Sequence, residues 1–341
     1  MVDKSNLKVY DRIDIEPIEL PSVSRLYSLE PIGIGTPLVE SISGYVARLA
    51  EAHCVTPKRL IMGEIAPLIL GDKYDSTVMT KNISTIFGNS DAKPAINGMR
   101  DKTKILVDVL EQLTLRRDLR YLSCFAWKGI IKERKLFRQH KAWCPECLDQ
   151  FRLQKHLYEP LLWSFKDITY CSQHNCQLMD CCPHCDSSLK AMPSASFAIA
   201  NNSRVGFCSR CKKWLGKGRE KNKVSAINLQ SDRPIVRGIE DLITVTSLLK
   251  SPPTLSTEIK KLQLIQFYFE RAVRQDLTQL IALGKIMEQL KIAIIQHNDK
   301  PLSLVNLLIP VCDRAQISIR QFFLSDFSTL SQNLDINFSR I

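Results

Sequence analysis

The sequence predicts a mainly α-helical protein with small β or zinc-ribbon modules. Three observations predict this class. Apolar residues recur at helical spacing near both ends of the 341-residue chain, and cysteines between the ends fall into paired C-x-x-C and C-x-x-H steps. Further helical periods follow the cysteine-rich region. We therefore expect an N-terminal helix-turn-helix, tandem zinc knuckles, and a C-terminal helical domain with a second helix-turn-helix.

Residues 1–37 are expected to form an extended arm. Four prolines and two glycines in this stretch exclude a long helix. A disordered leader is one interpretation. Apolar side chains such as Ile13, Leu26 and Leu29 support the other, in which the arm docks on another surface.

Residues 38–139 are expected to form an N-terminal helical domain that contains the first helix-turn-helix. Helical spacing runs from Leu38 to about His53, a break follows, and Thr56 then supplies an N-cap before proline. A later helix face, at 105–113, ends near Arg116. The first two helices have the outline of a helix-turn-helix, although any helical hairpin has the same outline.

The same pattern returns near the C-terminus, with a constant offset between matched positions. The turn and cap at 55–56 match 317–318, and the apolar pair at 60–61 matches Phe322 and Phe323. Pro310 is a mismatch, because it must kink or shorten the first helix of the second copy. Ordinary helical hairpins remain the alternative for both copies. With helical periods at 235–250, 256–274 and 276–296, this copy completes a C-terminal domain at 235–341, after a linker at 224–234.

The cysteines predict two structural zinc sites within residues 140–223. Nine of the twelve cysteines lie between positions 144 and 211, and the loops that separate the paired steps, at 148–170 and 186–207, are nearly equal in length. We assign the first ion to Cys144, Cys147, Cys171 and His174, and the second to Cys182, Cys185, Cys208 and Cys211. Because four protein ligands fill each quartet, both ions are expected to be structural and not catalytic.

Other cysteines are expected to have no role as ligands. Cys176 and Cys181 are interpreted as small buried or surface residues, and the cysteines at 54, 124 and 312 as core. His184 is expected to face solvent, although it lies between two ligands.

Charge and composition favour a cytoplasmic protein associated with DNA. The formal charge is +12, which two zinc–thiolate sites lower to about +9. No apolar run is long enough for a membrane span, and no signal-peptide pattern is present, so we expect no membrane. Two basic runs carry interleaved aromatic residues and predict phosphate contact. The candidate nucleic-acid contacts are Lys58, Arg59, Arg134, Lys135, Arg138, Lys212 and Lys213.

No enzyme is expected, since the chain lacks a Gly-rich phosphate loop, a convincing nucleophile–base pair and an acidic metal triad. The apolar pair Phe322 and Phe323 suits a protein interface, for self-association as a homodimer or for docking a partner. An apolar pair on a short helix also suits the core.

Several motifs together resemble the TniQ/TnsD family of transposition targeting proteins. The resemblance covers about residues 38–214 and is carried by GYVARL at 44–49, AEAHCVTPKRLI at 50–61, INGM at 96–99, LEQLT at 110–114, LRYLSCFAW at 119–127, HKAWCPECL at 140–148, YEPLLW at 158–163, YCSQHNCQL at 170–178 and CCPHC at 181–185.

The resemblance implies an adaptor that marks a transposon insertion site and recruits the AAA+ ATPase TnsC, which brings the transposase to target DNA. Shorter TniQ members can be coupled to an RNA-guided CRISPR effector complex (Cascade-like) and its guide RNA. Longer TnsD-like members recognise an attachment-site sequence directly. A length of 341 residues is nearer to the TniQ-like members, so we expect the adaptor, with the sequence-specific DNA-binding protein as the alternative.

Overall fold

The computed structural model describes residues 23–75, 77, 96–189, 204–216, 229–276, 278–295 and 300–338. Most of the predicted arm, at residues 1–22, lies outside the described residues. The longer elements, in chain order, are α1 (Ile42–Ala52), α2 (Pro57–Leu60), the π-helical turn η1 (Ile61–Ile65), α3 (Ala66–Leu70), α5 (Asp101–Thr114), α6 (Pro145–Leu153), β1 (Tyr170–Cys171), β2 (Cys176–Gln177), α8 (Leu229–Thr246), α9 (Leu255–Gln275), α10 (Gln279–Ile295), the π-helical turn η6 (Leu304–Leu308), α11 (Ile309–Arg314), α12 (Ile319–Leu324) and α13 (Phe327–Phe338). Short 3-10 turns are η2 (Gly71–Lys73), η3 (Leu119–Leu122), η4 (Phe125–Trp127) and η5 (Leu161–Ser164).

The prediction of a mainly helical protein is confirmed. Within the described ranges the only sheet is the antiparallel pair β1–β2, in which Tyr170 pairs with Gln177 and Cys171 pairs with Cys176. The helices expected at 256–274 and 276–296 appear as α9 and α10. Helix α8 begins at Leu229, so the part of the predicted linker at 229–234 is helical, with Pro234 inside the helix.

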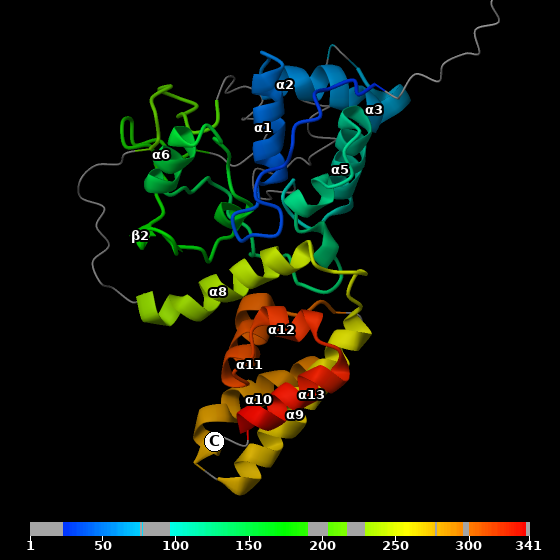
Figure 1. Cartoon of the computed structure of the whole chain (residues 1–341), viewed down its shortest axis with the longest axis vertical. Helices are drawn as coiled ribbons and strands as arrows, with labels where there is room; N and C mark the ends of the chain where they lie inside the picture. Colours follow the sequence, from blue (N-terminus) through cyan, green and yellow to red (C-terminus); the bar gives the residue numbers. More distant parts are fainter. Residues whose placement is uncertain are drawn as a thin grey trace, which may run out of the picture.

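Helix α8 crosses the molecule between its two halves (Figure 1). On one side lie the N-terminal helices and the cysteine-rich region, which touches α8 through η5; on the other lie α11 and α12. At Gly238 an added Cβ would lie 2.5 Å from Cγ1 of Ile309. Glycine is therefore required where α11 crosses α8.

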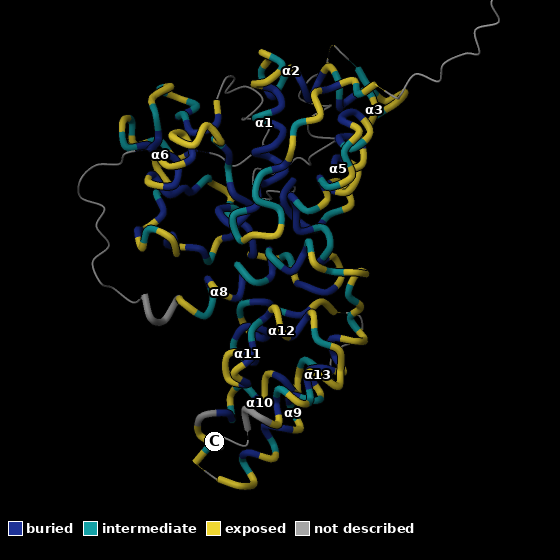
Figure 2. The backbone as a smooth tube through the Cα atoms, in the orientation of Figure 1, coloured by how far each residue is buried: buried dark blue, intermediate teal, exposed yellow. Residues whose placement is uncertain are grey.

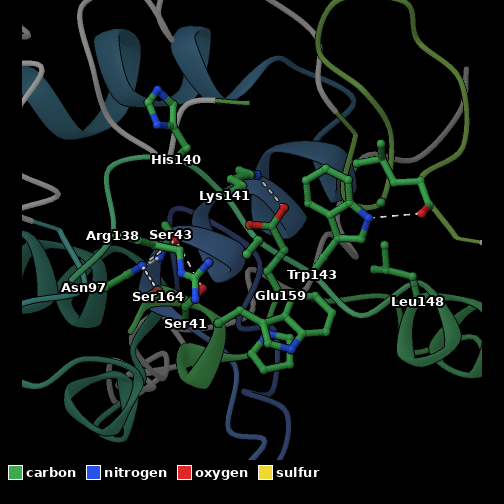
Figure 3. Close-up of a pocket in the computed structure, with 15 residues that line it drawn as sticks. Ser41, Ser43, Asn97, Arg138, His140, Lys141, Trp143, Leu148, Glu159 and Ser164 are labelled. Atoms are coloured by element: carbon green, nitrogen blue, oxygen red, sulfur yellow. Dashed lines mark hydrogen bonds and ion pairs between the residues drawn. The ribbon is translucent and has the colours of Figure 1, made fainter. Parts of the chain in front are cut away.

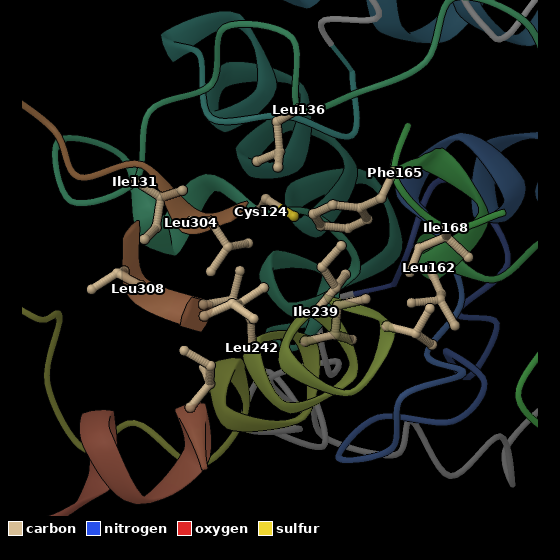
Figure 4. Close-up of a cluster of buried hydrophobic side chains, with 14 of the residues drawn as sticks. Cys124, Ile131, Leu136, Leu162, Phe165, Ile168, Ile239, Leu242, Leu304 and Leu308 are labelled. Atoms are coloured by element: carbon tan, nitrogen blue, oxygen red, sulfur yellow. The ribbon is translucent and has the colours of Figure 1, made fainter. Parts of the chain in front are cut away.

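The buried side chains form two clusters. The first joins α1, η1 and α5. The second runs from the cysteine-rich region to the C-terminal helices (Figure 2). At its centre, residues of the segment 124–136 and the loop at 162–168 meet α8 and η6, through Ile239 and Leu242 of α8 and Leu304 and Leu308 of η6 (Figure 4). The cysteine-rich region therefore shares a core with the helices that follow it, and our division into domains at 38, 140 and 235 stays a proposal.

The described part of the arm docks on the N-terminal helices without forming a helix of its own. Leu26 is buried and its backbone N–H donates to the carbonyl of Leu113 at 2.9 Å. The Tyr45 hydroxyl donates to the Leu29 carbonyl at 3.0 Å. These bonds fix residues 26–29 against α1 and α5.

The two terminal helix–turn units share one backbone geometry, at the constant offset that the sequence predicts. The first helix of each unit is capped by serine, Ser41 or Ser303, whose hydroxyl accepts an N–H three residues later. The second helix of each is capped in the same way, by Thr56 or Ser318.

The turns of the two units also correspond bond for bond. Cys54 and Gln316 occupy equivalent positions, and both have a left-handed φ, of 56° and 54°. Around them, three successive N–H groups in each unit bond to equivalent carbonyls, on residues 49, 51 and 50 in the first unit and on 311, 313 and 312 in the second. The repeat is therefore structural as well as sequential. Whether these units act as DNA-binding helix-turn-helices stays a prediction.

Pro310 causes the distortion that the sequence predicts. The first helix of the second unit opens with the π-helical turn η6 and continues as α11, with Pro310 in its first turn. The equivalent helix α1 has no proline and is a regular α-helix. A π-helical turn is a recognised way to accommodate such a break in the backbone hydrogen bonds.

The structure corrects the expected surface role of Phe322 and Phe323. Their exposed fractions are 0% and 6%, because both side chains turn into the second cluster. The Phe323 ring packs on Trp127 with centroids 4.6 Å apart, so its contact lies within the same chain. The buried Lys261 ammonium donates to both backbone carbonyls, at 2.9 and 3.3 Å, and caps the end of α12. Phe322 and Phe323 are therefore not available to form the predicted homodimer interface.

One of the cysteines predicted to be core also differs from the prediction. Cys54 is exposed, whereas Cys124 and Cys312 are buried as predicted.

Truncating Phe322 should destabilise the fold. Phe322→Ala is expected to lower the free energy of unfolding by about 3–5 kcal/mol, because it leaves a cavity in the core. Phe327→Ala is the matched control, since Phe327 is 53% exposed, and it should change stability by less than about 0.5 kcal/mol. Chemical denaturation measures both. A Phe322→Ala protein of unchanged stability but altered oligomeric state would restore the interface hypothesis.

Candidate metal centres

The first predicted quartet is brought together at the N-terminus of α6 and the β1–β2 hairpin. Cys144 is the N-cap of α6 and Cys147 lies in its first turn, so the helix end favours their thiolates. Cys171 ends β1, and His174 lies in the turn that follows. The ligand atoms of all four lie within 4.8 Å of one another.

The distances in this quartet fit a zinc tetrahedron. Nδ1 of His174 lies 3.5, 3.2 and 3.5 Å from the sulfur atoms of Cys144, Cys147 and Cys171. The sulfur atoms of Cys147 and Cys171 are 3.6 Å apart. Zinc bonds of about 2.3 Å to sulfur and about 2.0 Å to nitrogen give tetrahedral edges of roughly 3.8 and 3.5 Å. Three thiolates and one imidazole are also the donors that zinc prefers.

The negative charges of the clustered thiolates favour a bound cation. Hydrogen bonds from Cys147 and Cys171 hold the pKa of the Cys144 thiol far below its usual value. Hydrogen bonds of Cys147 to the sulfur atoms of Cys144 and Cys171 raise the pKa of the Cys147 thiol. Crowded sulfur atoms therefore share protons unless a divalent ion neutralises their charges.

Cys176 lies closer to this centre than the sequence indicates. It is buried, as the sequence interpretation allowed, but its sulfur is 3.3 Å from that of Cys144. It does not belong to the group of four whose ligand atoms are all mutually close. The first centre therefore offers four candidate ligands and has a fifth thiol beside them.

The second predicted quartet lies in two short turns. Cys182 and Cys185 belong to a turn closed by the bridge between Cys181 and Ser188, and Cys208 and Cys211 to one closed by the bridge between Phe207 and Trp214. The ligand atoms of the four cysteines again lie within 4.8 Å of one another, with Cys182–Cys211 at 3.6 Å and Cys185–Cys208 at 3.8 Å.

Backbone and side-chain groups around the second centre stabilise thiolates. N–H groups of Arg210 and Cys211 each donate to the Cys208 sulfur at 3.4 Å. The Ser187 hydroxyl, 2.9 Å from the Cys185 sulfur, lowers the pKa of that thiol to about 6. Tetrathiolate coordination suits zinc and leaves no open position for substrate. His184 is exposed, as the sequence predicts, and its Nε2 lies 2.9 Å from the Trp214 carbonyl.

The candidate nucleic-acid contacts fall in separate places. Arg134 and Lys135 share a hollow with Lys132 and Lys166. Arg59 lines a hollow at the turn of the first unit, next to Arg204. Lys58 is half-buried on α2, and Lys212 and Lys213 are exposed on the second centre. Lys166 is the member that the sequence analysis missed, because only the fold brings the loop at 166 beside residues 132–136.

Arg138 has a structural role instead of a surface contact. It lines a small hollow of about 50 Å³ between the start of α1 and the first centre (Figure 3). Its guanidinium donates to the carbonyls of Phe165, at 2.7 Å, and Ile168. In the same hollow Lys141 pairs with Glu159, and Asn97 donates to Ser43 and Ser164. Burial lowers the pKa of Arg138. The Nε and Nη2 groups of Arg138 are used within the fold, which argues against a phosphate contact, and that contact stays a prediction.

The aromatic residues of the two basic runs are also internal. Trp127, Phe137 and Trp143 are buried. Trp214 is half-buried, donates to Asp149 at 2.7 Å and lies under the Arg152 guanidinium. The interleaved aromatic residues, which supported phosphate contact in the sequence, therefore pack within the fold.

Two zinc ions per chain are expected, with Cys144 and not Cys176 as a ligand. Elemental analysis of protein purified without added metal should give about two zinc atoms for the natural chain and for Cys176→Ser. Cys144→Ser should give about one and unfold more readily, because bound structural zinc contributes folding free energy.

If Cys144→Ser does not fold, Cys211→Ser, at the half-buried edge of the second centre, tests the stoichiometry independently. Loss of one zinc from Cys176→Ser would show that the first quartet is assigned wrongly.

No helix among the described residues combines the length and the apolar character that a membrane crossing requires. A comparison with curated proteins finds no match. Residues 31–178 match the family model described as TniQ. This match covers the N-terminal helices, the first centre and η5, so the chain carries a TniQ domain, which implies a transposition-associated targeting protein.

Proposed function

We propose that this chain is a zinc-stabilised, non-catalytic adaptor that links a target-recognition complex to the AAA+ ATPase TnsC, and so to the transposase at the insertion site. The proposed recognition complex is a Cascade-like CRISPR effector with its guide RNA. The observation that carries the proposal is the TniQ domain at 31–178. The two centres support a structural role for metal, because each quartet already supplies four ligands.

The position of the two terminal units supports a protein that holds two partners. The first unit lies in the upper half of the molecule and the second below α8 (Figure 1). Beside each turn lies an open hollow, of about 630 Å³ in the first unit and about 530 Å³ in the second. Equivalent residues line both, including Glu51 and Asp313, and Cys54 and Gln316. Two similar but separate surfaces suit an adaptor.

A second candidate is a TnsD-like protein that reads an attachment site directly. The shared geometry of the two units favours it, because each has the capped second helix that a helix-turn-helix needs. The side chains on these helices argue against it. Gln321, a potential base-reading residue, uses its side chain to accept the Ser318 N–H at 2.8 Å. Only Lys58, Arg59 and Arg320 then remain as candidate base-reading side chains on the second helices of the two units.

The adaptor should co-purify with its partners through different units. Arg59→Glu and Arg320→Glu each reverse one exposed charge on the second helix of one unit, so each serves as the control for the other. A tagged full-length chain, co-expressed with neighbouring genes, should recover TnsC and a guide-RNA complex. Each variant is expected to lower the recovery of a different one. Equal recovery of both partners with both variants would contradict the two-sided adaptor.

DNA binding by the isolated chain should be weak, salt-sensitive and almost independent of sequence, because few base-reading side chains are available. Competition at physiological salt between a candidate attachment-site duplex and a scrambled duplex measures this. A preference of more than about a thousandfold for one duplex, as specific DNA readers show, would favour the TnsD-like protein.

A further inference from the structure

A hollow with an excess of positive charge lies where the segment 131–136, the loop at 166–167 and the start of η6 meet. Its volume is about 550 Å³. Four cationic side chains line it, Lys132, Arg134, Lys135 and Lys166, and one carboxylate, Asp167. We call this hollow the basic groove.

The walls of the basic groove are fixed by backbone hydrogen bonds. The Lys132 N–H donates to the Leu302 carbonyl at 2.8 Å, and the Leu302 N–H donates to the Ile130 carbonyl at 2.7 Å. The Lys166 N–H donates to the Leu136 carbonyl at 2.9 Å. Beneath these bonds, the side chains of Leu136 and Leu304 belong to the buried second cluster. Backbone hydrogen bonds and the buried cluster therefore hold in place the segments that carry the four cations.

The four cations have no side-chain partner among the residues that the structure describes. All four side chains are exposed, and within the described ranges no ion pair or side-chain hydrogen bond joins them to another residue. Glu133, the acid within their own run, turns away from them. Its carboxylate accepts from the Arg100 guanidinium and from the Met99 N–H, both at 3.2 Å.

Other basic residues close in sequence behave differently. Lys128 pairs with Asp101, and Lys141 pairs with Glu159. Arg116 pairs with Asp118. These three cations are neutralised within the fold, whereas no ion pair among the described residues neutralises the four cations of the basic groove.

We propose that the basic groove binds the phosphodiester backbone of a nucleic acid without reading its sequence. Four unpaired cations match a repeating anion, and each phosphate that they neutralise releases a counterion. None of the described residues that line the groove is aromatic and could stack on a base, so contacts to the backbone dominate. This proposal deepens the proposed targeting function and rests on it, since a targeting protein acts at nucleic acid.

An acidic protein fits the groove less well. Protein interfaces are depleted in lysine and depend on apolar or aromatic anchors. Here three of the four cations are lysines, and the lining residues Leu136 and Leu304 are buried beneath them.

The test compares two variants of the full-length, zinc-loaded chain with the same change in charge. The groove variant carries Lys132→Gln, Lys135→Gln and Lys166→Gln. The control carries Lys250→Gln, Lys260→Gln and Lys285→Gln, three lysines that are exposed on or near α9 and α10. Fluorescence anisotropy with a random-sequence 25-base-pair DNA duplex and a random single-stranded RNA, between 50 and 200 mM salt, gives affinity and salt dependence.

The groove variant should bind at least about tenfold more weakly at 100 mM salt, and its salt slope should fall by about three relative to the control. Zinc content and thermal unfolding should match in the two variants. The stronger of the DNA and RNA responses identifies the source of the backbone. Equal binding by the two variants would contradict nucleic-acid binding by the basic groove. It would not bear on the adaptor function, which the co-purification experiment tests. Binding of a poly-glutamate peptide as tightly as nucleic acid, lost in the groove variant, would assign the groove to an acidic protein and overturn the proposal.

Discussion

The junction at Trp127 is the contact on which the rest of the structure depends. Its indole is fully buried, its Nε1 donates to the Thr246 hydroxyl of α8 at 2.9 Å, and its ring packs on Phe323 of α12. Thr246 in turn donates to the Leu242 carbonyl, within the same helix. One side chain therefore joins the TniQ domain, α8 and the C-terminal helices. Burial of an aromatic of this size, with its single polar group satisfied, is among the strongest stabilising contacts that a core offers.

The metal centres solve a different problem. Between residues 140 and 216 the described chain forms little regular structure, with α6, two short strands and isolated bridges. Such a region has few backbone hydrogen bonds of its own to offset the loss of conformational entropy. Zinc at both quartets would supply the missing free energy locally. The start and the end of the region are also joined directly, because the Trp143 indole donates to the Leu215 carbonyl at 3.1 Å.

The two terminal units have one local geometry in two different environments. In both terminal units a serine caps the first helix, and the residue at the same position of the turn has a left-handed backbone conformation. Yet the first helix of the first unit starts against the Glu159 carbonyl, which accepts the Ser41 N–H at 2.9 Å, while the first helix of the second starts at the basic groove. The second helix of each unit exposes an arginine, Arg59 or Arg320, and buries the equivalent apolar position, Leu60 or Phe322. Capping and turn residues therefore set the same local geometry in both units, while the segments that contact the first helices differ.

The sequence by itself determined the local features of this protein. Helical periods, the repeated terminal unit, the break at Pro310 and the two quartets all follow from residues close together in the chain or from fixed spacings, and local sterics and ligand chemistry enforce them. Tertiary structure alone decided which surface residues are available. The basic run at 132–138 looks uniform in sequence, yet Arg138 turns inward, Glu133 turns to Arg100, and Lys166 arrives from a distant loop. Phe322, Phe323 and the aromatics of the basic runs became core for the same reason, since burial depends on which distant segments pack against a side chain, and no local pattern records that.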